Sequence, residues 1–453
     1  MIDELCIEAS ALAELRQRLL ASEVEQCAVL FASTAKRAGG QLRQLVREAI
    51  YPDRDSYRIQ SDRAAELAPS FVAAVAKRAK LEGLGLVFVH THPDGQAPDF
   101  SLIDDAGEAA LRAFLKVRGV LGPHAALVLS HQGLRCRSLG EDRALRVLSL
   151  GAERIVESEP QPKPSNDRQS GTDGSADLFD RQVRAFGADG QRRLEALRVA
   201  VVGVGGTGSI AVQQLVHLGV RDFILVDPDL VEDTNLNRIV GATLDDIGRE
   251  KIAVARRYLK AFRPGIHVRC VAGNIVHDHV ARELVEADLI FCCTDSHGSR
   301  AVVQQVAYQY MIPCIDMGST IAHSAGRVTG IFGRVQYLAP GHPCLWCSHL
   351  LDAAQVRRDM ASEVERRLDP YMEGSGEPAP SVISLNGTVV SLAISMMLSI
   401  VCGAPIMGRH LIYNASNTNL RLVRGKAEEN CFICSKVGAL GWGDARPLFT
   451  RRD

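Results

Sequence analysis

Residues 157–176 hold almost nothing that a hydrophobic core could bury. Their sequence, ESEPQPKPSNDRQSGTDGSA, consists mainly of proline, serine, glycine and charged residues. A segment of this composition cannot bury enough apolar surface to offset the entropy that it would lose on ordering. The chain of 453 residues is also too long for one ordinary core. We therefore expect two domains, residues 1–156 and 177–453, joined by a flexible linker over residues 157–176.

The charges of the chain are balanced, with 52 Lys and Arg against 53 Asp and Glu. This balance argues against a nucleic-acid-binding protein, which usually carries a basic excess. The first residues are acidic and lack the apolar run of a secretory signal, so we expect a cytoplasmic protein. Residues 379–408 are uncharged and long enough to span a membrane. Serine, threonine and asparagine interrupt them, which favours a buried helix and no membrane.

Both domains show strand patterns mixed with helical ones, which predicts an α/β fold for each. In the first domain we expect a helix near residues 10–20, a helix after Asp104, and strands at 27–31, 84–90, 125–130 and 134–139. In the second domain we expect helices at 207–218 and 276–285 and strands at 199–204, 223–227, 268–272, 289–292 and 313–317. This alternation predicts a Rossmann-like, doubly wound and mostly parallel sheet.

The first domain carries a pattern suited to zinc. His90 and His92 leave the end of a strand on the same face, because strand side chains alternate. Asp104, at the start of the next helix, can supply a third ligand. Two imidazoles and a carboxylate leave one position open for the water that catalytic zinc activates. Glu25 is our candidate for the base that accepts the water proton, with Glu23 as the alternative, and Ser101 can hydrogen-bond the tetrahedral oxyanion.

These residues resemble the JAMM (MPN-plus) metalloprotease family, whose pattern is a distant Glu, then His-x-His-Pro, then Ser-x-x-Asp. The resemblance covers roughly residues 1–150 and implies cleavage of peptide or isopeptide bonds after the C-terminal glycine of ubiquitin-like proteins. One more residue lies between Pro93 and Ser101 than the family usually has. Asp105 therefore remains the alternative to Asp104 as the third zinc ligand.

The second domain carries the glycine motif Gly203-Val-Gly205-Gly206-Thr-Gly208 between a strand and a helix. Backbone amides and the helix dipole at such a turn can bind phosphate, and Asp227 at the end of the next strand can bind a ribose. A dehydrogenase would share these features. Downstream, however, Arg238, Lys251 and Asp295 supply cations and a carboxylate, which phosphoanhydride chemistry needs and hydride transfer does not.

Together with Arg181-Gln182, the glycine motif and two Cys-x-x-Cys pairs resemble the ThiF/MoeB-like family, which includes the catalytic core of ubiquitin-activating enzymes. The resemblance spans about residues 178–435. It implies adenylation of a C-terminal glycine carboxylate by ATP, with Mg²⁺ as cofactor. The roles that it implies are ribose binding by Asp227, phosphate binding by Asn235, Arg238 and Lys251, and magnesium binding by Asp295, and we assign Asp229 to the same nucleotide site. Arg181 would reach into the ATP site of a second subunit, which implies a homodimer.

The two Cys-x-x-Cys pairs are Cys344/Cys347 and Cys431/Cys434. Four thiolates suit a closed structural zinc site, and a redox role is the alternative.

Relatives that transfer their substrate onto themselves place a cysteine in the segment after the first Cys pair, yet residues 348–401 contain none. Cys402 is expected to be a packing residue. Either the chain stops at the acyl-adenylate and hands it to a conjugating enzyme, or a hydroxyl takes over, for which Ser375 is the candidate.

Three hypotheses for the whole chain follow. The first is a bifunctional enzyme of a bacterial ubiquitin-like conjugation pathway, which activates a modifier and also matures or removes it. The second is activation and processing of a sulfur-carrier protein in cofactor or cysteine biosynthesis. The third joins an adenylating enzyme to a first domain that binds the modifier without cleaving it.

Overall fold

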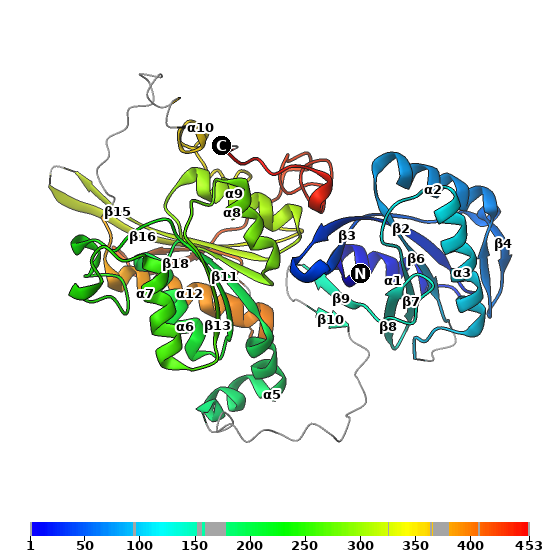
Figure 1. Cartoon of the computed structure of the whole chain (residues 1–453), viewed down its shortest axis with the longest axis horizontal. Coiled ribbons are helices and arrows are strands. Elements are labelled where there is room, and N and C mark those ends of the chain that lie inside the picture. The colour runs from blue at the N-terminus through cyan, green and yellow to red at the C-terminus, as the bar shows by residue number, and fades with distance from the viewer. Residues whose placement is uncertain are drawn as a thin grey trace.

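The computed structural model describes residues 2–451 except 94–96, 152–155, 159–177, 325, 363–364, 366–379 and 406–407. Two α/β lobes lie side by side, the first coloured blue to cyan and the second green to red (Figure 1). Most of the predicted linker falls outside the described residues. Its first two residues, Glu157 and Ser158, belong to a short strand that pairs with the first domain.

The first domain is built on an eight-stranded sheet of order β10-β9-β1-β3-β2-β6-β7-β8. Its strands and helices are β1 (Ile2–Glu8), α1 (Ala9–Leu19), β2 (Cys27–Lys36), β3 (Leu42–Ile50), β4 (Tyr57–Gln60), β5 (Ala65–Leu67), α2 (Pro69–Glu82), β6 (Gly85–Thr91), α3 (Leu102–Val117), β7 (Ala125–Ser130), β8 (Gly133–Ser138), β9 (Arg146–Leu150) and β10 (Val156–Ser158). Alternate residues of β6 face opposite layers, because Val87 and Val89 pack with α1 whereas Leu86 and Phe88 pack with α2 and α3. The predicted α/β fold is confirmed for this domain, although α3 begins two residues before Asp104.

The second domain is built on a sheet of order β13-β12-β11-β14-β15-β16-β17-β18. Its strands and helices are α5 (Asp180–Ala196), β11 (Arg198–Val202), α6 (Gly206–His217), β12 (Asp222–Val226), α7 (Lys251–Phe262), β13 (His267–Val271), α8 (Asp278–Ala281), β14 (Leu289–Cys292), α9 (His297–Gln309), β15 (Cys314–Ser324), β16 (Arg327–Leu338), α10 (Ala353–Met360), α12 (Ile383–Cys402), β17 (His410–Asn414) and β18 (Asn419–Leu422). Strands β11 to β15 run parallel to one another. Strands β16, β17 and β18 each pair antiparallel with the strand before them.

Helices cover both faces of this second sheet, as a doubly wound fold requires. On one face α6, α7 and α12 bury the side chains of Val199, Val201 and Phe223. On the other face α9 covers Ala200 and Val202. Among the described residues, α12 is the helix long and apolar enough to cross a membrane, and 61% of its apolar stretch is buried inside the protein. The prediction of a buried helix at this place is confirmed.

The two domains are joined by a buried set of charged residues. The guanidinium of Arg37 donates to the backbone carbonyl of Glu286, and the backbone N–H of Ala38 donates to Glu286 Oε1 at 2.6 Å. Arg43 Nε donates to Glu4 at 2.7 Å within the first domain, while its Nη2 lies 3.6 Å from Asp288 of the second. Apolar residues of both domains also share one core, in which Leu45 packs with Met311 and its neighbours.

Residues 436–446, which we call the C-terminal clamp, fasten the end of the second domain to the first. Ser33 Oγ donates to the Gly441 carbonyl at 2.5 Å, and the Lys36 backbone N–H donates to Asp444 at 2.7 Å. Arg47 donates to the carbonyls of Leu440 and Lys436, at 2.6 and 2.8 Å. Its guanidinium also lies over the ring of Trp442, 3.5 Å from the centroid. The clamp is part of the red segment in Figure 1, on the side of the second domain that faces the first.

Candidate functional site

A cavity of about 410 Å³ lies beyond the carboxyl ends of the parallel strands of the second domain. This is where ligands bind in open α/β sheets, because loops that leave neighbouring strands converge there. Nine of the residues predicted from the sequence line it, namely Gly203, Gly205, Gly206, Asp227, Asp229, Asn235, Arg238, Lys251 and Asp295. Gly208 is not part of the lining but packs beneath it.

The glycine motif forms a tight turn that enters α6. Gly203 has a φ of +84°, and a Cβ there would lie 3.0 Å from the Cys293 carbonyl oxygen. A Cβ on Gly208 would lie 1.8 Å from the Gly203 carbonyl oxygen, so no other residue fits this position without moving the turn. Gly205 has open space where a Cβ would stand. The glycines therefore bring the amino end of α6 to the cavity, where its free N–H groups favour an anion.

Asp227 fixes the loop beside the glycine motif. Its side chain is buried and accepts hydrogen bonds from the backbone N–H groups of Val204, at 2.6 Å, and Asp229, at 2.9 Å. Burial raises the pKa of this carboxyl, and the nearby Lys251 ammonium opposes the rise. In this structure Asp227 therefore holds the strand ends β11 and β12 together, and it reaches the cavity from that position.

Three cations face the cavity. Lys251 opens α7, and its Nζ lies 2.7 Å from Asp229 Oδ2. Arg238 follows a short 3₁₀ turn (Asp233–Asn235) and donates from Nη1 to the Thr234 carbonyl at 2.5 Å. Arg300, the third cation, was not predicted from the sequence. Together they supply the positive charge that a polyphosphate needs.

The buried carboxylate of Asp316 holds the side chain of Arg300 in position. Arg300 donates to the carbonyls of Thr294, at 3.0 Å, and Met317, at 3.1 Å, and its Nη1 lies 3.3 Å from Asp316. Arg334 Nη2 lies 2.5 Å from the same carboxylate, which is fully buried. Burial raises the pKa of Asp316, but the two guanidiniums outweigh it and keep that pKa below its usual range. Asp316 thus stays ionised and positions Arg300 at the cavity wall.

Two other predicted residues of this domain lie elsewhere. Arg181 is exposed on α5 and is not part of the cavity lining of its own chain. Ser375 lies outside the described residues. Cys402 ends α12, and its Sγ approaches the Gly190 carbonyl at 3.7 Å, which is a packing contact with α5.

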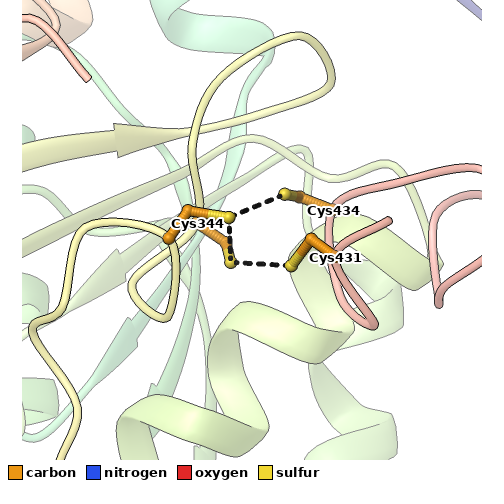
Figure 2. A group of neighbouring side chains, drawn as sticks. Cys344, Cys431 and Cys434 are labelled. Carbon is orange, nitrogen blue, oxygen red and sulfur yellow. Dashed lines mark hydrogen bonds between the residues drawn. The ribbon is translucent and has the colours of Figure 1, made fainter. Parts of the chain in front are cut away.

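The four predicted cysteines come together. Sγ of Cys344 lies 3.7 Å from that of Cys347 and 3.6 Å from that of Cys431, and Sγ of Cys347 lies 3.6 Å from that of Cys434. Figure 2 shows the sulfur atoms pointing toward one another from two separate loops. A tetrahedron with Zn–S bonds of about 2.3 Å has S–S edges of about 3.8 Å. The sulfur positions therefore fit a structural zinc ion, and all four could hold one.

In the first domain, His90, His92 and Asp104 also come together, with their potential ligand atoms all within 4.8 Å of one another. The two histidines stand at the end of β6, and Asp104 lies in the first turn of α3. Nε2 of His90 lies 3.1 Å from Asp104 Oδ1. Burial raises the pKa of Asp104, but the contact with His90 and the hydrogen bonds from Ser101 outweigh it and hold that pKa well below its usual range. Two imidazoles and an ionised carboxylate fit a zinc ion that keeps one position open.

Ser101 caps α3, and its hydrogen bonds orient the carboxylate of Asp104. Its backbone N–H and its hydroxyl donate to Asp104 Oδ2 at 2.6 and 2.7 Å. Asp105 points elsewhere, since its carboxylate lies 2.7 Å from Arg137 Nη2. Of the two alternatives for the third ligand, Asp104 is the one that faces the histidines.

Glu25 stands beside this group because of strand register. Cys27 on β2 pairs with His90 on β6, and the same register continued by two residues sets Glu25 opposite His92. Between these two pairs, the Gln26 backbone N–H donates to Thr91 Oγ1 at 2.9 Å, and the Gln26 carbonyl accepts from the Thr91 backbone N–H at 3.0 Å. Glu25 is buried whereas Glu23 is exposed. Burial raises the pKa of the Cys27 thiol to about 12, and Glu25 and Asp104 both add to the rise, so the two carboxylates lie near the same thiol.

The chain is similar in sequence to known activating enzymes and adenylyltransferases. The chain is 27% identical to the SAMP-activating enzyme E1 of Haloferax volcanii over 252 residues, which cover 56% of this chain and 85% of the relative. It is 27% identical to the molybdopterin-synthase adenylyltransferase of Escherichia coli over 260 residues, covering 57% and 96% of the two chains. It is also 27% identical to the sulfur carrier protein adenylyltransferase of Thermus thermophilus, covering 57% and 90%. Residues 179–433 match the profile of the ThiF family, and because this match spans more than half of the sequence, the chain belongs to the ThiF family.

Proposed function

We propose that the second domain adenylates the C-terminal glycine carboxylate of a ubiquitin-like or sulfur-carrier protein with ATP. The observation that carries the proposal is the convergence of the glycine turn, Arg238, Lys251 and Arg300 on one cavity. The names of the relatives support it, since they describe a SAMP-activating enzyme and adenylyltransferases of molybdopterin synthase and of a sulfur carrier.

In this reaction an oxygen of the glycine carboxylate attacks the α-phosphorus of ATP. The bond from that phosphorus to the bridging oxygen of the β-phosphate breaks, and pyrophosphate leaves with the bond electrons. Lys251 and Arg238 offset the charge that gathers on the leaving group, and Asp316 keeps Arg300 in place to do the same. Asp295 would hold Mg²⁺, which neutralises phosphate charge when it is bound.

ATP–pyrophosphate exchange tests the proposal. Label should pass from pyrophosphate into ATP only when a protein with a C-terminal glycine is present, because the acyl-adenylate must form before the reverse reaction can occur. Intact-mass spectrometry of that protein then separates the two kinds of pathway. A thiocarboxylate product identifies a sulfur carrier, whereas a covalent adduct with a target or a conjugating enzyme identifies a modifier. Exchange that ignores the partner protein contradicts the proposal.

We further propose that the first domain hydrolyses a peptide or isopeptide bond with zinc. The observation that favours this second activity is the group of His90, His92 and Asp104 with Glu25 opposite. These three residues would hold the ion, which polarises water toward attack on a carbonyl when it is bound. Glu25 would accept the proton of that water, and Ser101 orients Asp104. The alternative, a first domain that binds the modifier without cutting it, predicts no cleavage product.

A fusion of the modifier to a reporter protein tests the hydrolase. The wild-type chain should release the reporter after the modifier's final glycine, and a zinc chelator should stop the release. The same chain with Glu25→Gln should keep its zinc and lose the cleavage, which separates the role of the base from that of the ligands. Equal cleavage by Glu25→Gln would contradict the assignment of Glu25.

We also propose a structural zinc ion between the four cysteines and a homodimer in which Arg181 serves the cavity of the partner subunit. The exposure of Arg181, away from its own cavity, supports the second point. Mixing inactive Arg181→Ala and Lys251→Ala chains tests it. If the arginine acts across the interface, mixed dimers regain exchange activity at one site. A mixture that stays inactive, although the chains exchange subunits, contradicts the homodimer proposal.

A further inference from the structure

A second cavity, of about 220 Å³, lies between the two domains. Its walls come from β3 and β9 of the first domain and from α5 and the last turn of α12 of the second. Leu197, Asp288 and Pro313 also line it, and they stand just before β11, β14 and β15. The cavity therefore faces the amino ends of the parallel strands, whereas the cavity of about 410 Å³, which we call the nucleotide cavity, faces their carboxyl ends. A strand of five residues spans about 17 Å, so the two are separate sites.

Three arginines line this interdomain cavity, Arg43, Arg146 and Arg193, with Asp288 as the acidic residue beside them. Arg43 is 2% exposed, and its Nη2 makes no hydrogen bond with the part of the chain that the structure describes. The carboxylate of Asp288 lies 3.6 Å away, beyond hydrogen-bond distance. A buried guanidinium N–H without an acceptor costs stability, and an anion in the cavity would remove that cost.

The acidic residues nearby do not balance the arginines. Four arginines, Arg37, Arg43, Arg146 and Arg193, stand against three carboxylates. Glu4 and Asp288 each lie within 4.0 Å of the first three arginines, and Glu286 lies within 3.9 Å of Arg37. Burial, and then repulsion by Arg43, lower the pKa of the Arg37 guanidinium, although Glu4, Asp288 and Glu286 oppose the fall. Arg193 adds another cation; it donates to the Val401 carbonyl at 3.4 Å and forms no ion pair with a described residue. The cluster retains an excess of positive charge.

The rest of the cavity wall is apolar. Leu148 and Leu150 of the first domain face Met311 and Val401 of the second. At about 30 Å³ for each water molecule, the volume corresponds to about seven waters. A ligand of this place should therefore have an anionic head for the guanidiniums and a short aliphatic body. Arg146, 31% exposed at its side chain, and Asp288, 21% exposed, leave a route from solvent.

We propose that a small aliphatic carboxylate binds in this cavity and bridges the two domains. Its head would accept hydrogen bonds from Arg43 and Arg193, since guanidinium and carboxylate pair in the same plane. Its body would lie against Leu148 and Met311. Each domain supplies one of these two arginines and one of these two apolar side chains, so the site exists only while the domains are docked.

Isothermal titration calorimetry of the full chain with isocaproate tests the proposal. Isocaproamide, which has the same shape and no charge, should bind at least about tenfold more weakly, because hydrogen bonds between charged groups are the stronger kind. Arg193→Gln should weaken isocaproate binding by a similar factor. The matched control is Arg192→Gln, whose side chain is exposed on the same helix and pairs with Asp189. In hydrogen–deuterium exchange, isocaproate should protect the backbone amides of β9, Met311 and Ile312.

Several results would overturn the proposal. They are the absence of heat and of protection at millimolar isocaproate, equal binding of the amide, and binding that Arg193→Gln leaves unchanged. Displacement of isocaproate by equimolar inorganic phosphate would show an anion site with no preference for an aliphatic body, and would overturn the class of ligand. Since Arg193 is half-buried and forms no ion pair with Glu4 in the described structure, its variant keeps the buried Glu4–Arg43 pair intact.

Discussion

Replacement of Cys434 by serine should loosen the C-terminal clamp from the first domain. Cys434 stands two residues before Lys436, where the clamp begins, and it closes the four-sulfur group with Cys347. Serine is a poor zinc ligand, so we expect the variant to lose the structural zinc ion that we propose for the four cysteines. The loop that carries Cys431 and Cys434 would then lose its attachment to Cys344, and the clamp would be tied to the second domain by its own contacts, such as the hydrogen bond from Gln309 Nε2 to the Gly443 carbonyl at 2.8 Å.

The magnitude follows from the contacts of the clamp with the first domain. Ser33, Lys36 and Arg47 make four hydrogen bonds with it, each worth about 1 kcal/mol net. The stacking of Arg47 on Trp442 adds about 0.5–1 kcal/mol. Complete release therefore costs about 4–5 kcal/mol of docking free energy, which corresponds to about a thousandfold shift in the equilibrium between docked and undocked clamp.

Hydrogen–deuterium exchange at the Lys36 amide measures this release directly, because that N–H donates to Asp444 of the clamp. We expect its exchange in Cys434→Ser to rise by at least about tenfold, and zinc per chain to fall by one ion. Cys402→Ser is the matched control, since Cys402 is half-buried and lies outside the sulfur group. If the variant loses zinc and the Lys36 amide keeps its full protection, the clamp does not depend on the metal and our reasoning fails.

Three further predictions concern the two sites and the domain interface. Lys251→Ala should lower ATP–pyrophosphate exchange by about a hundredfold, whereas the exposed Lys260→Ala on the same helix should not. His92→Ala should abolish cleavage and one bound zinc while exchange persists, and exposed His131→Ala is its control. The pKa of Glu4 is lowered from 4.5 to about 2 by Arg43, Arg146 and Arg37, against burial, which raises it. Its contribution, about 3 kcal/mol, is complete above about pH 4.5 and lost as pH falls through about 2. Urea midpoints of the wild type should fall across that range, and those of Glu4→Gln should change less.

Local patterns predicted the parts of the fold that depend on neighbouring residues. The β11–turn–α6 unit was visible because its apolar strand, glycines and helix follow one another within about twenty residues. The antiparallel strands β16 to β18 were not placed in the sheet, since β16 joins β17 across about 70 residues of intervening chain, and only this pairing adds the hairpin of β17 and β18 to the sheet. For the same reason β1 was missed, although it pairs with both β3 and β9.

In the candidate sites, too, residues that belong to local motifs were predicted, and residues placed by distant contacts were missed. The residues of the nucleotide cavity were predicted from the sequence where they belong to a recognisable motif, as Lys251 and Asp295 do. Arg300 was missed because its position depends on how α9 packs over Asp316, which no spacing reveals. The choice of Asp104 over Asp105 rests on the cap that Ser101 makes at the start of α3, and the loop before it has an unusual length. The clamp was missed because residues 436–446 have no regular apolar period.

The clamp also has a consequence for the order of events during synthesis. The first domain is complete near residue 158, but the side chain of Arg47 and the backbone of Lys36 receive their partners only when residues 436–446 have been made. At about 5–20 residues per second, that delay is about 15–60 s. During this time the β2–β3 surface is exposed to solvent, without the residues that cover it in the complete protein. Chaperones and nascent neighbouring chains would meet this surface before the protein's own last segment does.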